Sequence, residues 1–247
     1  MHEDFKEQGI ILRMKPHGET GAIVTVFAQQ SGLLTGYVYA VHSRQNVQYF
    51  QLGNLIDFTY TRKKSFDFGS YTAHHAVPLW YFLQDRPEAF YAFTALCDIL
   101  WFCLPKEVSE PVLYQHFLQL MSFFKNDDRL IVGKMTCYFL IEMLKELGFS
   151  PDIYHCAVTG QSDNLCYFSP KTARVVSYNI GKPYHDKLWP CPAFLQDETA
   201  DMTYKDIVDA LKICGFLVEK NLFFPQQKYL PENFMRLYEY YQRGISC

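Results

Sequence analysis

The pattern of apolar and polar residues changes character near residue 80. Before that point, short segments alternate between apolar and polar residues, and turn-forming residues separate them. After it, apolar residues recur with helical spacing. A period of two is typical of strands with one wet face, and a period near 3.6 is typical of helices. The chain is therefore predicted to be α+β, with a strand-rich domain over 1–80 and a helical domain over 81–247.

The stretch 8–39 predicts three strands. In 9–15 we expect Ile11, Arg13 and Lys15 on one face and Ile10, Leu12 and Met14 on the other. Turn residues fill 16–21 and 29–32, β-branched residues enrich 22–28, and a third strand follows over 33–41. Two more strands are predicted at 56–62 and 66–73. Five short strands whose edges must be covered favour a closed barrel of the OB-fold type.

Helices are predicted at 85–104, 109–125, 127–147 and 231–242, and another begins at Thr203. That helix ends at Gly215 or continues to about Phe223. Asp85–Glu88 resembles a capping box, Thr203 and Asp206 form another cap, and Gly148 is placed to end the third helix in a left-handed conformation. The periodicity disappears over about 150–201, where we expect an irregular insert with short strands at 165–169 and 174–178.

Composition excludes several classes of protein. The net charge of −3 argues against a generally basic nucleic-acid binder. Between Arg13 and Lys64, however, there are six Lys or Arg and only two acidic residues. Eight cysteines without paired spacing do not suggest a disulfide framework. The N-terminus lacks the apolar region of a signal peptide, and the longest apolar segment, 89–104, is too short to span a bilayer. We expect a cytoplasmic protein without membrane association.

No catalytic or phosphate-binding motif is found. The adjacent His74 and His75 are expected on opposite faces of a strand, so they do not suggest a metal site. Glu142 and Glu146 lie one helical turn apart but read as a solvated helix face. A hydrolase that uses Cys156 with His155 or His185 is the remaining enzymatic alternative.

The barrel offers the residue types that bind single-stranded nucleic acid, where bases stack on rings and cations hold phosphates. Available rings are Tyr37, Tyr39, Tyr49, Phe50 and Tyr60. Candidate DNA-binding residues are Arg13, Lys15, Tyr37, Arg44, Arg62, Lys63 and Lys64. The alternative is that these charges are only the wet side of a barrel and the aromatic residues its core.

Two groups of residues carry a resemblance. The first is Ile11–Arg13, Gly18–Thr20, Val26–Phe27 and Ser31–Leu34; the second is Leu147–Asp152, Cys156–Gly160 and Phe168–Pro170. In this order they resemble the RecO family of bacterial recombination mediators. The resemblance implies a non-enzymatic DNA repair protein of the RecF pathway. Such proteins bind single- and double-stranded DNA, anneal strands, and help load RecA together with RecR on DNA coated by single-strand binding protein (SSB).

The sequence departs from the family's pattern in two places. Many members hold zinc with four cysteines in the insert, whereas here Cys156 is followed by Thr159, Ser177 and Ile180 at the other positions. We therefore expect no zinc and no other cofactor. The loop after the third strand is strongly basic in many members but holds only Arg44 here, which predicts weaker and more salt-sensitive DNA binding.

The family also docks the acidic, Phe-terminated tail of SSB on its helical domain. Candidate residues for this contact are Arg129, Lys134, Lys212 and Lys220. Taken one at a time, each also fits a solvated helix face. The alternative function is a protein-interaction scaffold with weak or no DNA binding.

Overall fold

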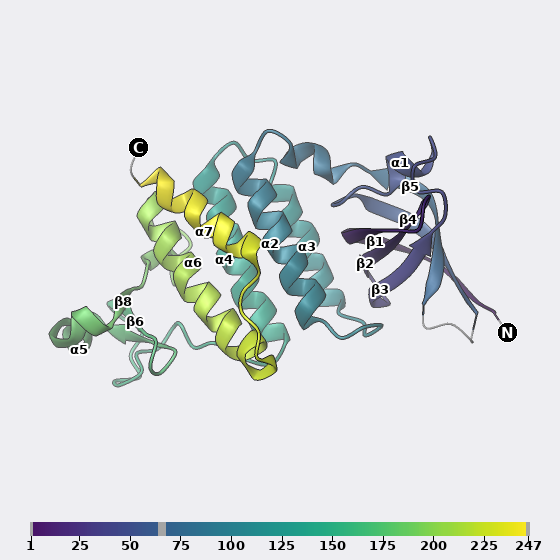
Figure 1. Cartoon of the computed structure of the whole chain (residues 1–247). Coiled ribbons are helices and arrows are strands. Elements are labelled where there is room, and N and C mark those ends of the chain that lie inside the picture. Colours follow the sequence, from purple (N-terminus) through teal and green to yellow (C-terminus); the bar gives the residue numbers. More distant parts are fainter. Residues whose placement is uncertain (1, 64–67, 246–247) are drawn as a thin grey trace. The chain divides into compact units, whose positions relative to one another are not determined.

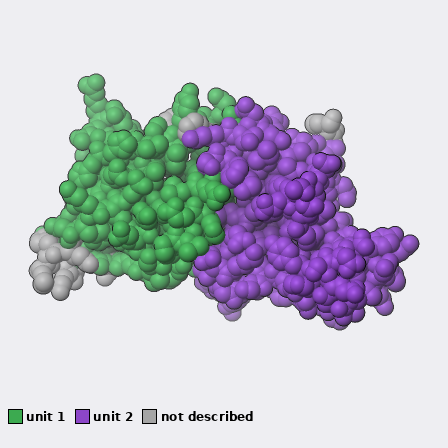
Figure 2. Space-filling view, turned by 180° about the vertical axis from the view of Figure 1, so that it is seen from behind, with its two compact units in different colours: residues 1–121 green, residues 122–247 purple. Residues whose placement is uncertain are grey.

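The computed structural model describes residues 2–63 and 68–245. By backbone contact the chain divides into two compact units, Met1–Met121 and Ser122–Cys247 (Figure 2). The first unit contains the predicted strand-rich segment and two of the helices that follow it. Residue 80 marks the change from strands to helices, and its role as a domain boundary stays a prediction.

The first unit is built on a closed barrel in the order β1-β2-β3-β5-β4 (Figure 1). Neighbouring strands are antiparallel except β3 and β5, which pair in parallel at Gly36–Gly69 and Tyr37–Ser70. The predicted OB-type barrel and the α+β class are confirmed. The strands are β1 (His2–His17), β2 (Gly21–Ala28), β3 (Gly32–Val38), β4 (Leu55–Lys63) and β5 (Gly69–Val77).

A β-bulge between Ile11 and Arg13 breaks the predicted alternation in β1. Ile10, Ile11 and Leu12 are all buried, whereas Arg13 and the residues after it are exposed. The expectation that Ile11 shares a face with Arg13 is therefore wrong. The bulge adds one residue to β1, and an extra residue reverses the facing of every side chain beyond it.

The barrel interior is aromatic. Phe50 and Tyr60 are each 1% exposed and belong to the core, so the expectation that they are available for stacking is wrong. The Tyr60 hydroxyl donates to the carbonyl of Thr35 at 2.8 Å and accepts the N–H of Gly69 at 2.7 Å. This one side chain on β4 therefore joins β3 and β5, where the barrel closes.

In the part of the first unit that the structure describes, the barrel is followed or interrupted by the α-helices α1 (Asn46–Tyr49), α2 (Pro87–Cys103) and α3 (Pro111–Phe123). A 3-10 helix at Leu79–Leu83 precedes α2. Arg86 occupies the N-cap of α2 without a side-chain cap, so the predicted capping box is wrong, and the helix begins with Pro87 at its first turn. Phe27 on the outside of β2 contacts the rings of Tyr114 and Phe117 from α3. One outer face of the barrel is thus buried within the first unit.

The second unit is built on α4 (Arg129–Glu146), α6 (Tyr204–Val218) and α7 (Glu232–Gly244). Helix α6 packs against both α4 and α7 (Figure 1). The close approach to α4 depends on Gly133, where a Cβ would lie 2.6 Å from Ile207. Asp128 caps α4, and Thr203 caps α6 as predicted, where it forms a capping box with Asp206. Helix α6 passes through Gly215 and ends in a π-helical turn at Glu219–Phe223.

The α4 helix ends at Glu146, and Gly148, two residues on, takes the predicted left-handed conformation with a φ of +86°. The insert follows, with a small sheet in the order β7-β6-β8 and a short helix α5. Its elements are β6 (Leu165–Ser169), β7 (Arg174–Ser177), α5 (Tyr178–Gly181) and β8 (Trp189–Pro190), with 3-10 turns at Lys182–Lys187 and Ala193–Leu195. Phe168 and Trp189 pack on Phe216 of α6. Among the described residues, no helix is both long and apolar enough to cross a membrane.

Candidate nucleic-acid interface

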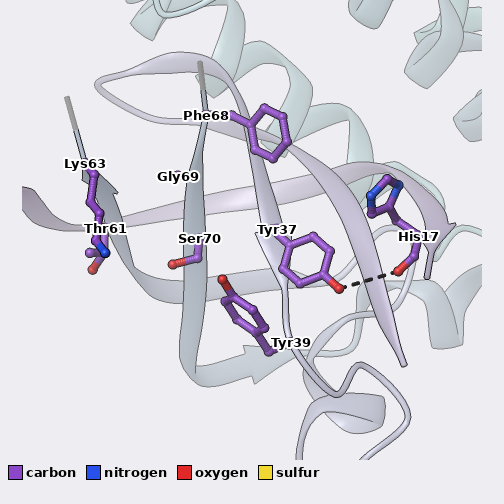
Figure 3. A pocket seen from close by; sticks show the side chains of 8 residues that line it. All are labelled: His17, Tyr37, Tyr39, Thr61, Lys63, Phe68, Gly69 and Ser70. Atoms are coloured by element: carbon purple, nitrogen blue, oxygen red, sulfur yellow. Dashed lines mark hydrogen bonds between the residues drawn. The ribbon is translucent and has the colours of Figure 1, made fainter. Parts of the chain in front are cut away.

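A groove of about 510 Å³ lies on the outer face of the barrel, where β3, β4 and β5 end or begin (Figure 3). It combines aromatic rings with hydroxyl groups and a cation. The lining residues are His17, Tyr37, Tyr39, Thr61, Lys63, Phe68, Gly69 and Ser70. This is the mixture of groups that stacks bases and holds a backbone in single-strand binding folds.

Tyr37 and Tyr39 form the aromatic centre of the groove. Their ring centroids are 4.6 Å apart at 74°, and His17 lies edge-on to Tyr37 at 5.9 Å. Tyr37 is held in place because its ring covers Gly21, where a Cβ would lie 1.8 Å from the hydroxyl oxygen. That hydroxyl also donates to the His17 carbonyl at 3.5 Å (Figure 3). Tyr39 is 68% exposed and Phe68 is 41% exposed, so both present ring area to a ligand.

The predicted basic turn is divided. Lys63 lines the groove, but Arg62 belongs to the opposite face of β4 and pairs with Glu107 at 2.5 Å. Glu107 is held there because its N–H donates to the Leu33 carbonyl at 3.1 Å. Lys64 lies outside the described residues. Of the two cations that the structure describes here, Lys63 therefore lies in the groove and Arg62 does not.

The strand register places Lys15 on the same outer face as the groove. Lys15 pairs with Ile23, Ile23 with Tyr37, and Tyr37 with Ser70. Residues directly opposite in neighbouring strands point to one face. Arg13 lies two residues further along β1, and its guanidinium carbon is 4.0 Å from the ring centroid of Trp101 in α2. Arg13 and Lys15 thus share a face, as predicted.

Arg44 is exposed in the loop between β3 and α1 and does not line the groove. This loop is fixed by Asn46, whose side-chain amide donates to the carbonyls of Tyr39 and Ala40. Tyr49, another predicted stacking residue, borders a different hollow with Val47 and Pro78. The sequence reading missed His17, Phe68 and Trp101. His17 ends β1 and Phe68 directly precedes β5, and a position at a strand end is the signal that could have found them.

The histidine pair does not alternate as expected. A bulge opposite Asp57 and Phe58 lets both side chains reach the outer face of β4. His74 contacts the hydroxyl of Thr59 at 2.7 Å, and His75 faces the carboxylate of Asp57 at 3.6 Å. The prediction of opposite faces is therefore wrong for this pair.

The second unit carries a slot of about 260 Å³ beside α6. Of the predicted partner-binding residues, Lys212 lines this slot, with its ammonium group 4.3 Å from the ring of Trp189. Lys220 does not line it, but its ammonium group lies 5.9 Å from the ring of the lining residue Phe216. Arg129 and Lys134 instead lie on α4, where Lys134 donates to the carbonyl of Glu198 at 2.5 Å. The slot is lined by Trp189, Leu211, Lys212, Gly215, Phe216, Glu219, Leu230, Phe234, Met235 and Tyr238.

At the four positions where the resemblance implies a zinc site, the donor groups do not fit zinc, and the absence of zinc stays a prediction. Cys156 is the only thiol among Cys156, Thr159, Ser177 and Ile180, and a structural zinc needs four soft ligands. Instead, the Cys156 sulfur accepts the N–H of Ser177 at 3.4 Å. Burial opposes ionisation, but hydrogen bonds from Ser177 and Thr159 outweigh it and lower the pKa of Cys156 to about 6.

In the hydrolase alternative, His155 or His185 would act with Cys156, but the hydrogen bonds of both histidines go to other groups. Nδ1 of His155 faces Asp152 at 3.0 Å, and Nδ1 of His185 faces the carbonyl of Lys182 at 3.1 Å. Asp152 also accepts from Arg174 at 2.7 Å. Burial raises the pKa of Asp152, but its hydrogen bonds from His155 and Arg174 outweigh this and lower it. These groups tie the start of the insert to β7.

A closed OB-type barrel with an exposed aromatic groove, followed by a helical unit with a small insert, defines a two-unit OB-fold protein. The family model described as "Recombination protein O N terminal" matches residues 1–77, and that described as "Recombination protein O C terminal" matches residues 84–228. The chain belongs to the RecO family.

Relatives match over nearly the whole length. The DNA repair protein RecO of Xanthobacter autotrophicus is 32% identical over 215 residues, which is 87% of each chain. The DNA repair protein RecO of Granulibacter bethesdensis is 31% identical over 233 residues, covering 93% of this chain and 92% of that one. A role in DNA repair follows from the family.

Proposed function

We propose that the groove on the barrel binds single-stranded DNA and that the protein acts without catalysing a reaction. The observation that carries this proposal is the ring pair of the half-buried Tyr37 and the exposed Tyr39, which lines one groove with Lys63. Unpaired bases have free faces that stack on such rings, and the nearby ammonium group neutralises a phosphate. Duplex DNA offers only its backbone to the same groove, so its binding depends more on the cations than on the rings.

We further propose that the protein anneals complementary strands and assists RecA loading together with RecR on DNA coated by SSB in the bacterial cytoplasm. The slot beside α6 supports a contact with the SSB tail. Its lining is largely apolar, which suits a terminal Phe side chain, and Lys212 and Lys220 at its edge suit an acidic peptide. The two surfaces lie in different units, so one protein holds both a strand and the protein that coats it.

The test compares Tyr39→Ala with Tyr81→Ala by titrating a fluorescent oligothymidylate with the full chain. Tyr39 and Tyr81 are 68% and 66% exposed, but only Tyr39 lines the groove. Because stacking on one aromatic residue contributes ~1–3 kcal/mol per base, Tyr39→Ala is expected to weaken binding by about 5- to 150-fold. Tyr81→Ala leaves it unchanged.

The same titration at rising salt measures the part that charge plays. Affinity is expected to fall with a logarithmic slope of about −1.4 if Lys63 and Lys15 contact phosphates, at roughly −0.7 for each contact. Equal effects of the two tyrosine variants would show that the strand does not occupy the groove. Absence of DNA binding by the unaltered protein would favour the interaction scaffold.

A further inference from the structure

Arg13 and Trp101 form an exposed stack on the first unit, outside the groove. The guanidinium carbon of Arg13 is 4.0 Å from the Trp101 ring centroid, and Trp101 is 42% exposed. Within the part of the chain that the structure describes, no carboxylate forms an ion pair with Arg13 or with Lys15. A planar cation held against an indole ring thus meets solvent without a counter-charge.

This stack lies on the same outer face as the groove. Two interstrand steps of ~4.8 Å separate Lys15 from Tyr37 through Ile23, and Arg13 is two residues, or ~6.6 Å, further along β1. Combined at right angles, these steps give about 12 Å. Since stacked nucleotides rise by ~3.4 Å, a segment of about three or four nucleotides covers that distance.

We propose that the Arg13–Trp101 pair is a second stacking site for an unpaired nucleobase of the strand that occupies the groove. The base stacks on the guanidinium plane that Trp101 holds in position, and Lys15 neutralises a phosphate between the two sites. The planar, weakly hydrated guanidinium suits this role, whereas the ammonium of lysine does not stack. The inference rests on the proposed single-strand binding and extends it to a longer site.

The proposed second stacking site should add affinity for some DNA molecules and not for others. An oligonucleotide too short to leave the groove gains nothing from Arg13, and one that spans both sites does. A duplex keeps its bases inside the helix, so it cannot insert one against the guanidinium. The alternative is a purely structural role, in which Arg13 only packs β1 against α2. In that case Arg13 affects the protein's stability and not its dependence on DNA length.

The experiment measures the affinity of the full chain for a length series of oligothymidylates, with Arg13→Lys as the main variant. Arg13→Lys keeps the charge on an exposed residue and removes the planar stack, so the fold should be preserved. For oligomers that span both sites we expect a loss of about fivefold, and for the shortest binding oligomers and for duplex DNA no loss. Tyr39→Ala, in contrast, weakens binding at every length.

A second readout is tryptophan emission. Binding of a long oligomer is expected to quench the tryptophan fluorescence of the unaltered protein. This quenching should be lost in Trp101→Phe, which keeps Trp80 and Trp189. Equal losses at all lengths in Arg13→Lys, no loss at any length, or quenching that persists in Trp101→Phe would each overturn the second site. These results differ from a failure of the groove proposal, in which Tyr39→Ala has no effect.

Discussion

Removing the Tyr60 hydroxyl tests how the barrel is closed. Beyond the short β3–β5 pairing, this hydroxyl links the three strands at their junction, since it donates to Thr35 on β3 and accepts from Gly69 on β5. Tyr60→Phe keeps the ring, which is 1% exposed, and deletes only the oxygen. Packing is therefore almost unchanged, and the variant reports on the two hydrogen bonds.

The expected cost follows from the groups that lose this partner. A buried N–H or carbonyl left unsatisfied costs ~1–3 kcal/mol, and the Thr35 carbonyl is only partly buried, so Tyr60→Phe should lower the free energy of unfolding by about 2–3 kcal/mol. Tyr71→Phe is the matched control. Tyr71 is also buried in the barrel core, but its hydroxyl makes the single bond to the Leu34 carbonyl at 3.0 Å, so about 1 kcal/mol is expected.

The assay is urea unfolding of the full chain, monitored with a signal that reports on the barrel. Linear extrapolation to zero urea gives the free energy of unfolding. The slope with urea should be the same in all three proteins, because a change in slope would mean that the states themselves had changed. Gly69 also lines the groove, so Tyr60→Phe should weaken single-strand binding although it does not touch the strand. If Tyr60→Phe costs no more than Tyr71→Phe, the barrel closes without help from this hydroxyl and the reasoning fails.

Two further predictions concern the second unit. The lowered pKa of Cys156, about 6 against an ordinary value near 9, means that the unfolded chain binds more protons between these two pH values. Stability should therefore rise with pH in that window, by up to about 1.4 kcal/mol per pH unit. This added stability is lost as the pH falls toward 6. Urea unfolding midpoints measured from pH 6 to 8 should rise in the unaltered protein and not in Cys156→Ser. The same pH dependence in both proteins would contradict the prediction. Lys212→Glu should weaken binding of an acidic, Phe-terminated peptide by about tenfold in a fluorescence titration, whereas Lys205→Glu, elsewhere on α6, should have little effect. Equal losses would indicate general charge attraction and not the slot.

Periodicity predicted the strands and the barrel because the inner face of each strand is apolar. It failed at two bulges, one in β1 between Ile11 and Arg13 and one in β5, where His74 is the added residue opposite Asp57 and Phe58. A bulge is a single added residue that leaves no mark in composition, so Ile11 was wrongly grouped with Arg13 and Lys15, and His74 and His75 were wrongly placed on opposite faces. The helix caps show the same limit. Thr203 caps α6 as predicted, but Pro87 begins α2 without a cap from Asp85.

The aromatic residues show what the sequence already contained. In β4, Tyr60 falls on the same face as Ile56 and Phe58, and the polar residues Asp57, Thr59 and Thr61 fall on the other. The alternation of the strand therefore already predicts that Tyr60 lies in the core. Tyr37 occupies the outer side of β3 between the buried residues Gly36 and Val38. The stack of Arg13 on Trp101 was not readable, because it joins residues 88 positions apart in the sequence through tertiary packing alone.

The helices of the first unit bear on where a DNA-binding fragment can end. A chain cut at residue 80 would lose Tyr114 and Phe117, which cover the fully buried Phe27. Exposing that side chain alone costs roughly 1.5–3 kcal/mol, a large share of the stability of a small barrel. The cut also removes Trp101 and Glu107, the partners of Arg13 and Arg62. A fragment ending at 80 that failed to bind DNA would therefore report the loss of these contacts, whereas the full chain separates the groove from the scaffold alternative.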